Sequence, residues 1–330
     1  MRLTAIVLVA GWVVLACAGG TAWAAPPSSR PVPPGGGETV DRPAYAPLPD
    51  GGPAVPSPLR VGPIPDEVRR EYNVNLFYTR CVVVRGIPII GSANVSDYAF
   101  LECAWTLDHL LDGRTMALDA LHRAKVRVGI LAVTEYTMDL PENQSPRMIA
   151  RGAFNDRRSR GLGGLPLATC AEENLLSLRG DPYARENITI HEFSHTLASA
   201  IGRTNPDWYR KKLAGAFEQA ARGGGYGRSY AISNPQEYWA EGAQAWFDCA
   251  NPRNSGGAAT RAQLKEKDPA LAELLTEVYG DGPWRYRRTT DAGRAAADVA
   301  HLAGMDRTQF PVFSFNLSPR IRAAAAQAPK

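Results

Sequence analysis

Two histidines and a glutamate in this chain have the spacing that a metal site on a helix requires. In His191-Glu192-Phe193-Ser194-His195 the imidazoles are four residues apart, so on an α-helix they lie one turn above each other on the same side. Zinc binds neutral imidazole nitrogen at about 2.0–2.1 Å, and a catalytic zinc keeps one position open for water. Glu192 is rotated by about 100° from its helix neighbour, so its carboxylate can act on that water instead of on the metal. The motif predicts hydrolytic chemistry, with His191 and His195 as zinc ligands and Glu192 as the general base.

The third zinc ligand has to come from elsewhere in the chain. A histidine six residues after His195 would complete another common pattern, but Ile201 occupies that position. A carboxylate is the remaining option, and Glu237 and Glu241 are four residues apart on one side of a later predicted helix. Both also have ordinary explanations. Glu237 follows Asn234 by three residues, where a capping box places a glutamate, and Glu241 suits a solvated helix position.

The segment Tyr230-Ala-Ile-Ser-Asn-Pro-Gln-Glu237-Tyr-Trp-Ala-Glu241, about 40 residues after the His-Glu-Phe-Ser-His run, carries a resemblance. It is similar to the catalytic domain of anthrax lethal factor and related bacterial zinc peptidases, in which Y-x6-E-[FY]-x-A-E follows H-E-F-x-H at a similar distance. The resemblance implies Glu237 as the third ligand, the Tyr230 hydroxyl as a transition-state stabiliser, and Glu241 as the carboxylate that orients a ligating histidine. It covers about 60 residues, His191 to Phe247, so it implies a zinc endopeptidase without identifying the protein or peptide substrate.

Hydrophobic spacing predicts the elements that would position these residues. Apolar residues at 190, 193, 197 and 201 form one stripe, so we expect a helix over 186–201 with Asn187 as its cap and Gly202 as its stop. This stripe argues against the ordinary alternative of two unrelated histidines on a helix surface. Further expected elements are helices over 98–111, 115–124, 207–221 and 237–247, strands over 75–84 and 126–134, an Arg/Gly-rich loop over 151–166, and an edge strand over 165–170.

These elements and the resemblance together predict one α+β domain over residues 66–322. We expect a zincin-like fold with a small mixed sheet, the active-site helix and a mostly helical C-terminal half. Residues 25–65 are crowded with Pro and Gly and lack an apolar period, which predicts a disordered tether, although a pro-segment remains open. The Ala-rich residues 323–330 are expected to be a disordered tail.

The N-terminus has the layout of a secretory signal peptide over residues 1–24. Arg2 precedes an apolar run from Leu3 to Ala16, and Ala22-Trp23-Ala24 fits an A-x-A cleavage site. The run is too short for a bilayer span, which needs roughly 20 residues. Val14-Leu15-Ala16-Cys17 also resembles a lipobox, so a lipid anchor at Cys17 is an alternative. We expect a secreted or cell-envelope protein without a stable membrane span.

Four cysteines remain after the signal, which suits an oxidising compartment and two disulfides. Sequence proximity favours Cys81 with Cys103 and Cys170 with Cys249, and buried free thiols are the alternative. The formal charge of +4 includes no dense basic run, so we expect no nucleic-acid partner, and we expect a monomer.

Two other classes of function remain open. In one, an exported binding protein uses zinc structurally, but structural sites usually include cysteine, and no C-x2-C pair is present. In the other, a catalytically inactive binding protein keeps the metallopeptidase fold. The presence of both Glu192 and Tyr230 favours the active enzyme.

Overall fold

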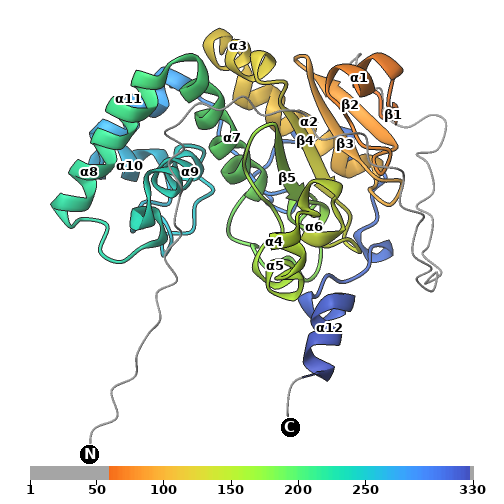
Figure 1. Cartoon of the computed structure of the whole chain (residues 1–330). Coiled ribbons are helices and arrows are strands. Elements are labelled where there is room, and N and C mark those ends of the chain that lie inside the picture. Colours follow the sequence, from red (N-terminus) through yellow and green to blue (C-terminus); the bar gives the residue numbers. More distant parts are fainter. Residues whose placement is uncertain (1–58, 328–330) are drawn as a thin grey trace, which may run out of the picture. The chain divides into compact units, whose positions relative to one another are not determined.

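A five-stranded mixed sheet organises the part of the chain that the computed structural model describes, residues 59–327 (Figure 1). The strands lie in chain order across the sheet. They are β1 (Gly62–Pro63), β2 (Arg80–Val84), β3 (Ile87–Gly91), β4 (Arg127–Leu131) and β5 (Leu167–Ala171). The β1–β2 and β2–β3 pairs are antiparallel, whereas β3–β4 and β4–β5 are parallel. With its many helices, this sheet confirms the predicted α+β class.

The connections between strands follow from these directions. Strands β2 and β3 form a hairpin whose turn residues Arg85 and Gly86 have φ of 47° and 76°, the left-handed conformation that tight hairpin turns need. Parallel strands need longer crossovers. Helices α2 (Asp97–Leu111) and α3 (Thr115–Arg123) connect β3 to β4. The β4–β5 connection contains η1 (Thr137–Asp139), η2 (Pro141–Asn143), α4 (Pro146–Ile149) and α5 (Gly152–Arg158).

The main hydrophobic core lies between one face of the sheet and the helices. It includes Val82 and Ile89 from the sheet, Phe100 and Leu107 from α2, and Phe193 from α7 (Ile188–Thr204). A smaller cluster on other sheet residues contains Tyr78, Ile90 and Leu131 and is joined by Val68 of α1 (Asp66–Glu71). Because strand side chains alternate between faces, β2, β3, β4 and β5 each contribute to both cores through different residues.

Helices fill most of the second half of the chain. Helix α7 follows β5 through α6 (Glu172–Leu175), and it packs against both β5 and α9 (Pro235–Trp246). It therefore lies between the sheet and the C-terminal helices (Figure 1). The remaining elements are η3 (Trp208–Leu213), α8 (Ala214–Gly223), η4 (Tyr230–Ser233), α10 (Arg261–Lys267), α11 (Pro269–Tyr279), η5 (Ala296–Leu302), η6 (Arg307–Gln309), η7 (Phe315–Leu317) and α12 (Pro319–Ala326).

Several expected boundaries differ from the structure. Helix α7 continues through Gly202 to Thr204, and a Cβ at Gly202 would lie 3.2 Å from Cβ of Tyr209, so this glycine permits close helix packing instead of stopping the helix. The expected loop over 151–166 contains α5. The strand predicted over 75–84 begins only at Arg80. The sheet begins at Gly62, inside the expected tether, and α12 extends to Ala326, inside the expected tail.

The four cysteines are free and buried in this structure, so the favoured pairs Cys81–Cys103 and Cys170–Cys249 are not formed. Cys81 belongs to the smaller cluster, whereas Cys103 lies in the main core. Sequence proximity did not predict this, because side chains alternate between the two faces of a strand and the Cys81 side chain lies on the face away from α2. The thiol of Cys103 instead contacts Cys170, and burial, followed by this contact, raises its pKa.

Two expectations concern membranes and the N-terminal segments. Within residues 59–327, none of the helices combines the length and the apolar character that crossing a bilayer would take. The predicted signal peptide, Cys17 and residues 25–58 of the predicted tether lie outside the described residues.

Candidate metal centre

Helix α7 brings His191 and His195 together as their spacing predicts. The helix begins after Asn187, whose Oδ1 accepts a 2.8 Å hydrogen bond from the backbone N–H of Ile190. The apolar stripe is buried against the core, which fixes the opposite side of the helix toward α9. The two imidazole Nε2 atoms are 3.2 Å apart.

Helix α9 supplies the carboxylate. Glu237 Oε2 is 3.1 Å from His191 Nε2 and 3.3 Å from His195 Nε2. The side chain of Asn234 caps α9 by accepting from the backbone N–H groups of Gln236 and Glu237. The Glu237 carboxylate does not return to the backbone of its cap, so the capping-box explanation for this residue is excluded.

The ligand atoms of His191, His195 and Glu237 have the separations that one small ion needs. They form a nearly equilateral triangle with edges of 3.1, 3.2 and 3.3 Å. Three ligands at about 2.0–2.1 Å in tetrahedral geometry would be roughly 3.3 Å apart. The donor set of two imidazoles and one carboxylate is one that catalytic zinc uses. These residues therefore fit a zinc ion with one open position.

The electrostatics of the triangle show how strongly its members interact. Burial by itself would lower the pKa of His191, but the hydrogen bond that its imidazole donates to Glu237 and the charges of Glu192 and Glu241 outweigh burial and raise this pKa to about 10. Burial opposes ionisation of Glu237, and its bonds to both imidazoles overcome this and hold its pKa well below the usual 4.5. The cluster therefore favours positive charge between these three side chains.

Gln244, which the sequence did not single out, holds His191 in place. Its Oε1 is 3.1 Å from His191 Nδ1, and its Nε2 donates to the backbone oxygen of Asn187 at 3.0 Å. Glu241 was expected in this role, but its Oε1 is 3.9 Å from His191 Nδ1, beyond hydrogen-bond distance. Burial raises the pKa of Glu241 to about 8. Gln244 follows Glu241 by three residues on the same side of α9, which is the only signal in the sequence that pointed to it.

The role of Gln244 gives a testable expectation. Gln244→Leu should lower zinc affinity by about 10- to 100-fold, because His191 loses the partner that fixes its ring orientation and tautomer. Competition with a chromophoric chelator measures this affinity, and circular dichroism checks that the fold is kept. Glu241→Gln is the matched control on the same helix and should weaken zinc binding less than Gln244→Leu does. If Glu241→Gln weakened zinc binding more than Gln244→Leu, Glu241 would be the residue that orients His191.

A glycine-rich segment, Gly161–Gly164, packs closely against Glu192. A Cβ at Gly163 would be 2.5 Å from the backbone oxygen of Glu192 and 2.5 Å from Cβ of His195, and a Cβ at Gly161 would be 2.9 Å from Cγ of Glu192. Only residues without a side chain fit so close to α7. This segment was expected to be part of a solvated loop.

The glycine segment also adds to the edge of the sheet. Leu162 forms an antiparallel bridge with Thr169 of β5, and the Thr169 N–H donates to the Leu162 carbonyl at 2.8 Å. The expected edge strand over 165–170 is therefore covered at Thr169 by Leu162. At the other end of the segment, Gly164 N–H donates to Thr196 Oγ1 of α7 at 3.0 Å.

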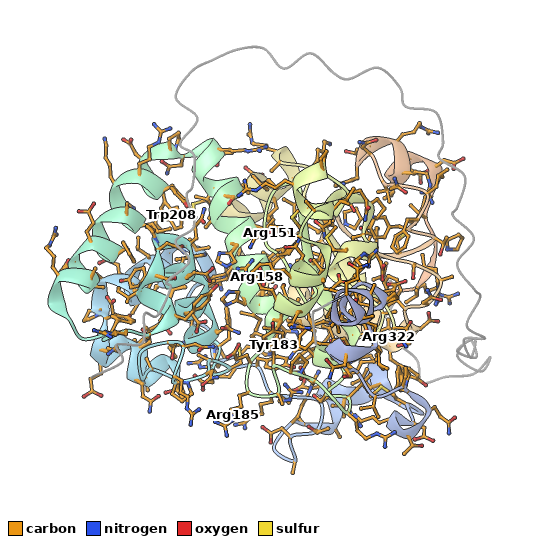
Figure 2. The ribbon with its side chains drawn as sticks, turned by 60° about the horizontal axis from the view of Figure 1, so that its bottom comes forward. Arg151, Arg158, Tyr183, Arg185, Trp208 and Arg322 are labelled. Atoms are coloured by element: carbon orange, nitrogen blue, oxygen red, sulfur yellow. The ribbon has the colours of Figure 1, made fainter. Side chains whose placement is uncertain are left out.

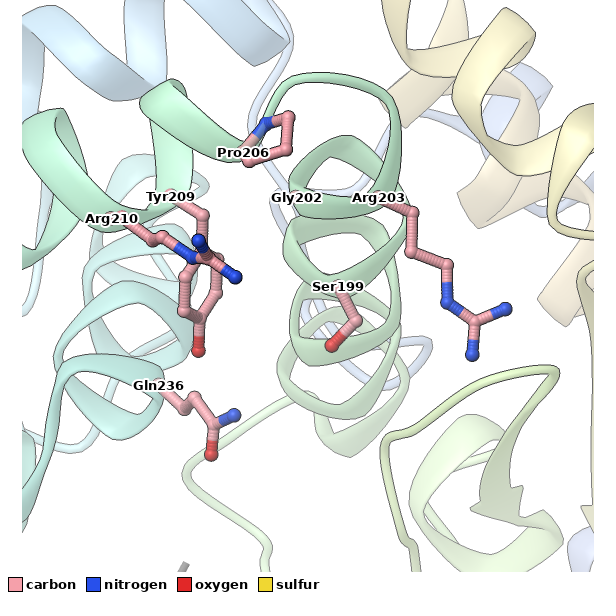
Figure 3. Close-up of a pocket in the computed structure, with 7 residues that line it drawn as sticks. All are labelled: Ser199, Gly202, Arg203, Pro206, Tyr209, Arg210 and Gln236. Carbon is pink, nitrogen blue, oxygen red and sulfur yellow. The ribbon is translucent and has the colours of Figure 1, made fainter. Parts of the chain in front are cut away.

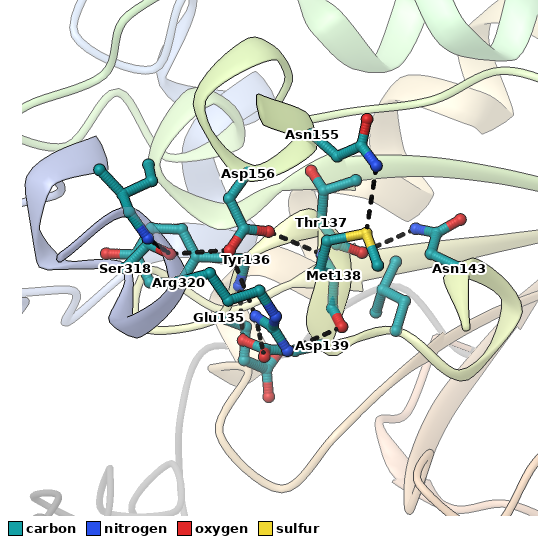
Figure 4. Close-up of polar contacts among 12 residues, drawn as sticks. Glu135, Tyr136, Thr137, Met138, Asp139, Asn143, Asn155, Asp156, Ser318 and Arg320 are labelled. Carbon is teal, nitrogen blue, oxygen red and sulfur yellow. Dashed lines mark hydrogen bonds and ion pairs between the residues drawn. The ribbon is translucent and has the colours of Figure 1, made fainter. Parts of the chain in front are cut away.

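Buried ionic contacts anchor the residues just before the glycine segment. Arg160 is fully buried and pairs with Glu173 at 2.6 Å. Four residues earlier in the chain, Asp156 of α5 accepts from Met138 N–H at 2.9 Å and from Ser318 Oγ at 2.7 Å (Figure 4). The residues that lead into the glycine segment are therefore held by buried polar contacts.

Tyr183 and Arg158 lie close to each other (Figure 2). The Tyr183 hydroxyl donates to the backbone oxygen of Arg158 at 3.2 Å. Burial and, to a smaller extent, the negative charge of Glu192 raise the pKa of Tyr183 to about 12. The Glu192 carboxylate therefore interacts with this tyrosine as well as with the metal triangle.

Tyr230 from η4 completes the site. Its hydroxyl donates to Glu237 Oε1 at 2.8 Å, and 42% of its surface is exposed. Every residue that the sequence predicted for catalysis or metal binding is thus found around one point between α7, α9 and η4.

The chain was compared with models of protein families, with curated protein sequences and with solved structures, and no match was found.

Proposed function

We propose that this chain is an exported, zinc-dependent endopeptidase with a zincin-like fold. The observation that carries the proposal is the triangle of His191, His195 and Glu237 ligand atoms beside the Glu192 carboxylate. Its edges match those of a tetrahedral zinc site with an open position. The export part of the proposal depends on the signal peptide predicted over residues 1–24.

The side chains around the triangle suit hydrolysis of a peptide bond. A zinc ion bound there would acidify water and polarise a substrate carbonyl group. Glu192 accepts the proton from the attacking water and passes it to the departing amine. Gln244 and the α7 backbone hold the imidazoles in position throughout.

In this proposal the Tyr230 hydroxyl stabilises the oxygen that becomes negative as water adds to the carbonyl. Partial burial, followed by the charge of Glu237, raises its pKa above the ordinary value of 10.0, so the hydroxyl remains a proton donor near neutral pH. A donor of this kind contributes roughly 10²- to 10³-fold to the rate.

The glycine segment is the proposed docking strand for the substrate backbone. The polar groups of Leu162 face β5 through its contacts with Thr169. Because backbone groups alternate along a strand, those of Gly163 point away from β5, whereas the N–H and the carbonyl of Gly161 are both bonded to Ser159 Oγ. An extended peptide can add at this edge, antiparallel to the segment and over Glu192.

This docking role predicts a contrast between two neighbouring glycines. Gly163→Ala should lower kcat/KM by about tenfold or more with zinc content unchanged, because the added Cβ pushes the strand off Glu192 and His195. Gly164→Ala should have little effect, since a Cβ there meets nothing within 4 Å. Peptide hydrolysis by the two zinc-loaded variants makes the comparison, and equal rates would remove the segment from substrate binding.

Hydrolysis of a mixed peptide library, analysed by mass spectrometry, tests the proposed function as a whole. Cleavage should stop with a chelator and return when zinc is restored. Zinc binding without cleavage of any peptide would instead favour the inactive binding protein on the same fold.

A further inference from the structure

A cavity of about 320 Å³ lies between α7 and the segment that follows it, and it continues toward α9 (Figure 3). Its lining combines two arginines and other polar side chains with a larger apolar surface. The residues are Ser199, Gly202 and Arg203 of α7, Pro206, Tyr209 and Arg210 after it, and Gln236 of α9. In Figure 3, Arg203 and Arg210 lie on opposite sides of the Ser199 hydroxyl.

The cavity directly adjoins the candidate metal centre. Ser199 follows His195 by four residues, so the two side chains share one side of α7 and are separated by about 6 Å along the helix axis. Gln236 immediately precedes Glu237 on α9. A substrate bound over the metal triangle therefore has this cavity within reach.

The two arginines give the cavity a positive charge without an internal partner. Both are exposed, and within residues 59–327 neither forms an ion pair. The acidic residue between them in sequence, Asp207, is bonded to Lys211 at 2.7 Å. Guanidinium groups bind carboxylates with charge-assisted hydrogen bonds, and Ser199 and Gln236 add neutral polar groups to the lining.

We propose that this cavity binds an aspartate or glutamate side chain of the substrate, which makes Arg203 and Arg210 specificity-determining residues. The inference rests on the proposed peptidase function and adds a substrate class to it: peptides with an acidic residue near the cleaved bond.

With the antiparallel docking proposed above, the direction of the glycine segment predicts on which side of the cleaved bond that acidic residue lies. Gly161 lies against Ile188, and Gly164 bonds to Thr196, so the segment runs in the same direction as α7. A substrate antiparallel to it has its N-terminal part toward Ser199. At about 3.3 Å per extended residue, the 6 Å to the cavity corresponds to about two residues. The acidic side chain therefore belongs two or three residues before the scissile bond.

The test uses amidated peptides in which one glutamate is moved through positions on both sides of a fixed cleavage site, each paired with the glutamine peptide. The zinc-loaded protein should prefer glutamate over glutamine by roughly fivefold in kcat/KM at two or three residues before the bond, and not after it. In the double variant Arg203→Gln with Arg210→Gln this ratio should fall to about one. Arg222→Gln, an exposed arginine of α8 that pairs with Glu218, should keep the wild-type ratio.

The outcomes separate the cavity from the peptidase proposal. A glutamate preference that is absent, or that survives the double substitution, overturns the cavity assignment. A glutamine peptide with a free C-terminus is also tested. If the protein prefers this peptide over its amidated form, the cavity binds a terminal carboxylate, and the proposal of an aspartate or glutamate side chain is overturned.

A second measurement does not depend on turnover. It uses fluorescence anisotropy to compare how the glutamate and glutamine peptides bind to the zinc-loaded Glu192→Gln protein. If no peptide is cleaved by the wild type, the peptidase proposal fails. Glutamate-dependent binding that requires Arg203 and Arg210 then still supports the cavity, and binding indifferent to them overturns it.

Discussion

Glu192→Gln should abolish peptide hydrolysis and leave zinc bound. The carboxylate lies beside the triangle of His191, His195 and Glu237 but outside it, and those three residues are the ones that could hold the ion. Glutamine keeps the size of the side chain but cannot accept the proton of the attacking water. General-base catalysis contributes about 10²- to 10⁴-fold, so we expect kcat to fall by roughly 10³-fold or more.

Zinc content by mass spectrometry and hydrolysis of one peptide are measured on the same protein sample. His195→Ala is the comparison and should lose both zinc and activity. If Glu192→Gln cleaves peptide at a rate near that of the wild type, another group is the base.

Glu237→Gln is the second substitution with a large expected effect. The amide keeps the shape of the side chain but removes the negative charge that both imidazoles contact at 3.1 and 3.3 Å. Loss of a direct ligand should weaken zinc binding by more than the 10- to 100-fold typical of supporting residues. Activity at limiting zinc should fall in parallel.

Glu241→Gln is the control for this substitution, because it changes the same kind of side chain one turn along α9. It should retain most of the zinc affinity, since the Glu241 carboxylate is 3.9 Å from the nearest imidazole nitrogen. Should the two variants behave alike, or in reverse, Glu237 would not be the third ligand.

The motif residues were predictable because helical geometry is local. Four-residue spacing fixes His191 and His195 on one side of any α-helix, and Asn187 and Asn234 mark helix starts that the structure confirms. The choice between Glu237 and Glu241 was not local, because both occupy the same side of α9. It is decided by how α9 crosses α7, which depends on packing between distant parts of the chain.

Other features depended on long-range contacts from the start. Gly161 and Gly163 look like loop residues in the sequence, and only their approach to Glu192 and His195 shows why side chains are excluded there. The disulfide expectation failed for a related reason, since the face of the sheet that Cys81 occupies depends on strand register. Strand β3 was not predicted, because Pro88 interrupts a short apolar run that follows β2 directly.

A crystal structure of the zinc-loaded protein tests the central claim most directly. We predict one zinc ion per chain, at about 2.0–2.2 Å from Nε2 of His191, Nε2 of His195 and one oxygen of Glu237, with water at the remaining position. A zinc ion bound elsewhere, or closed off by a fourth protein ligand, would contradict the hydrolytic account.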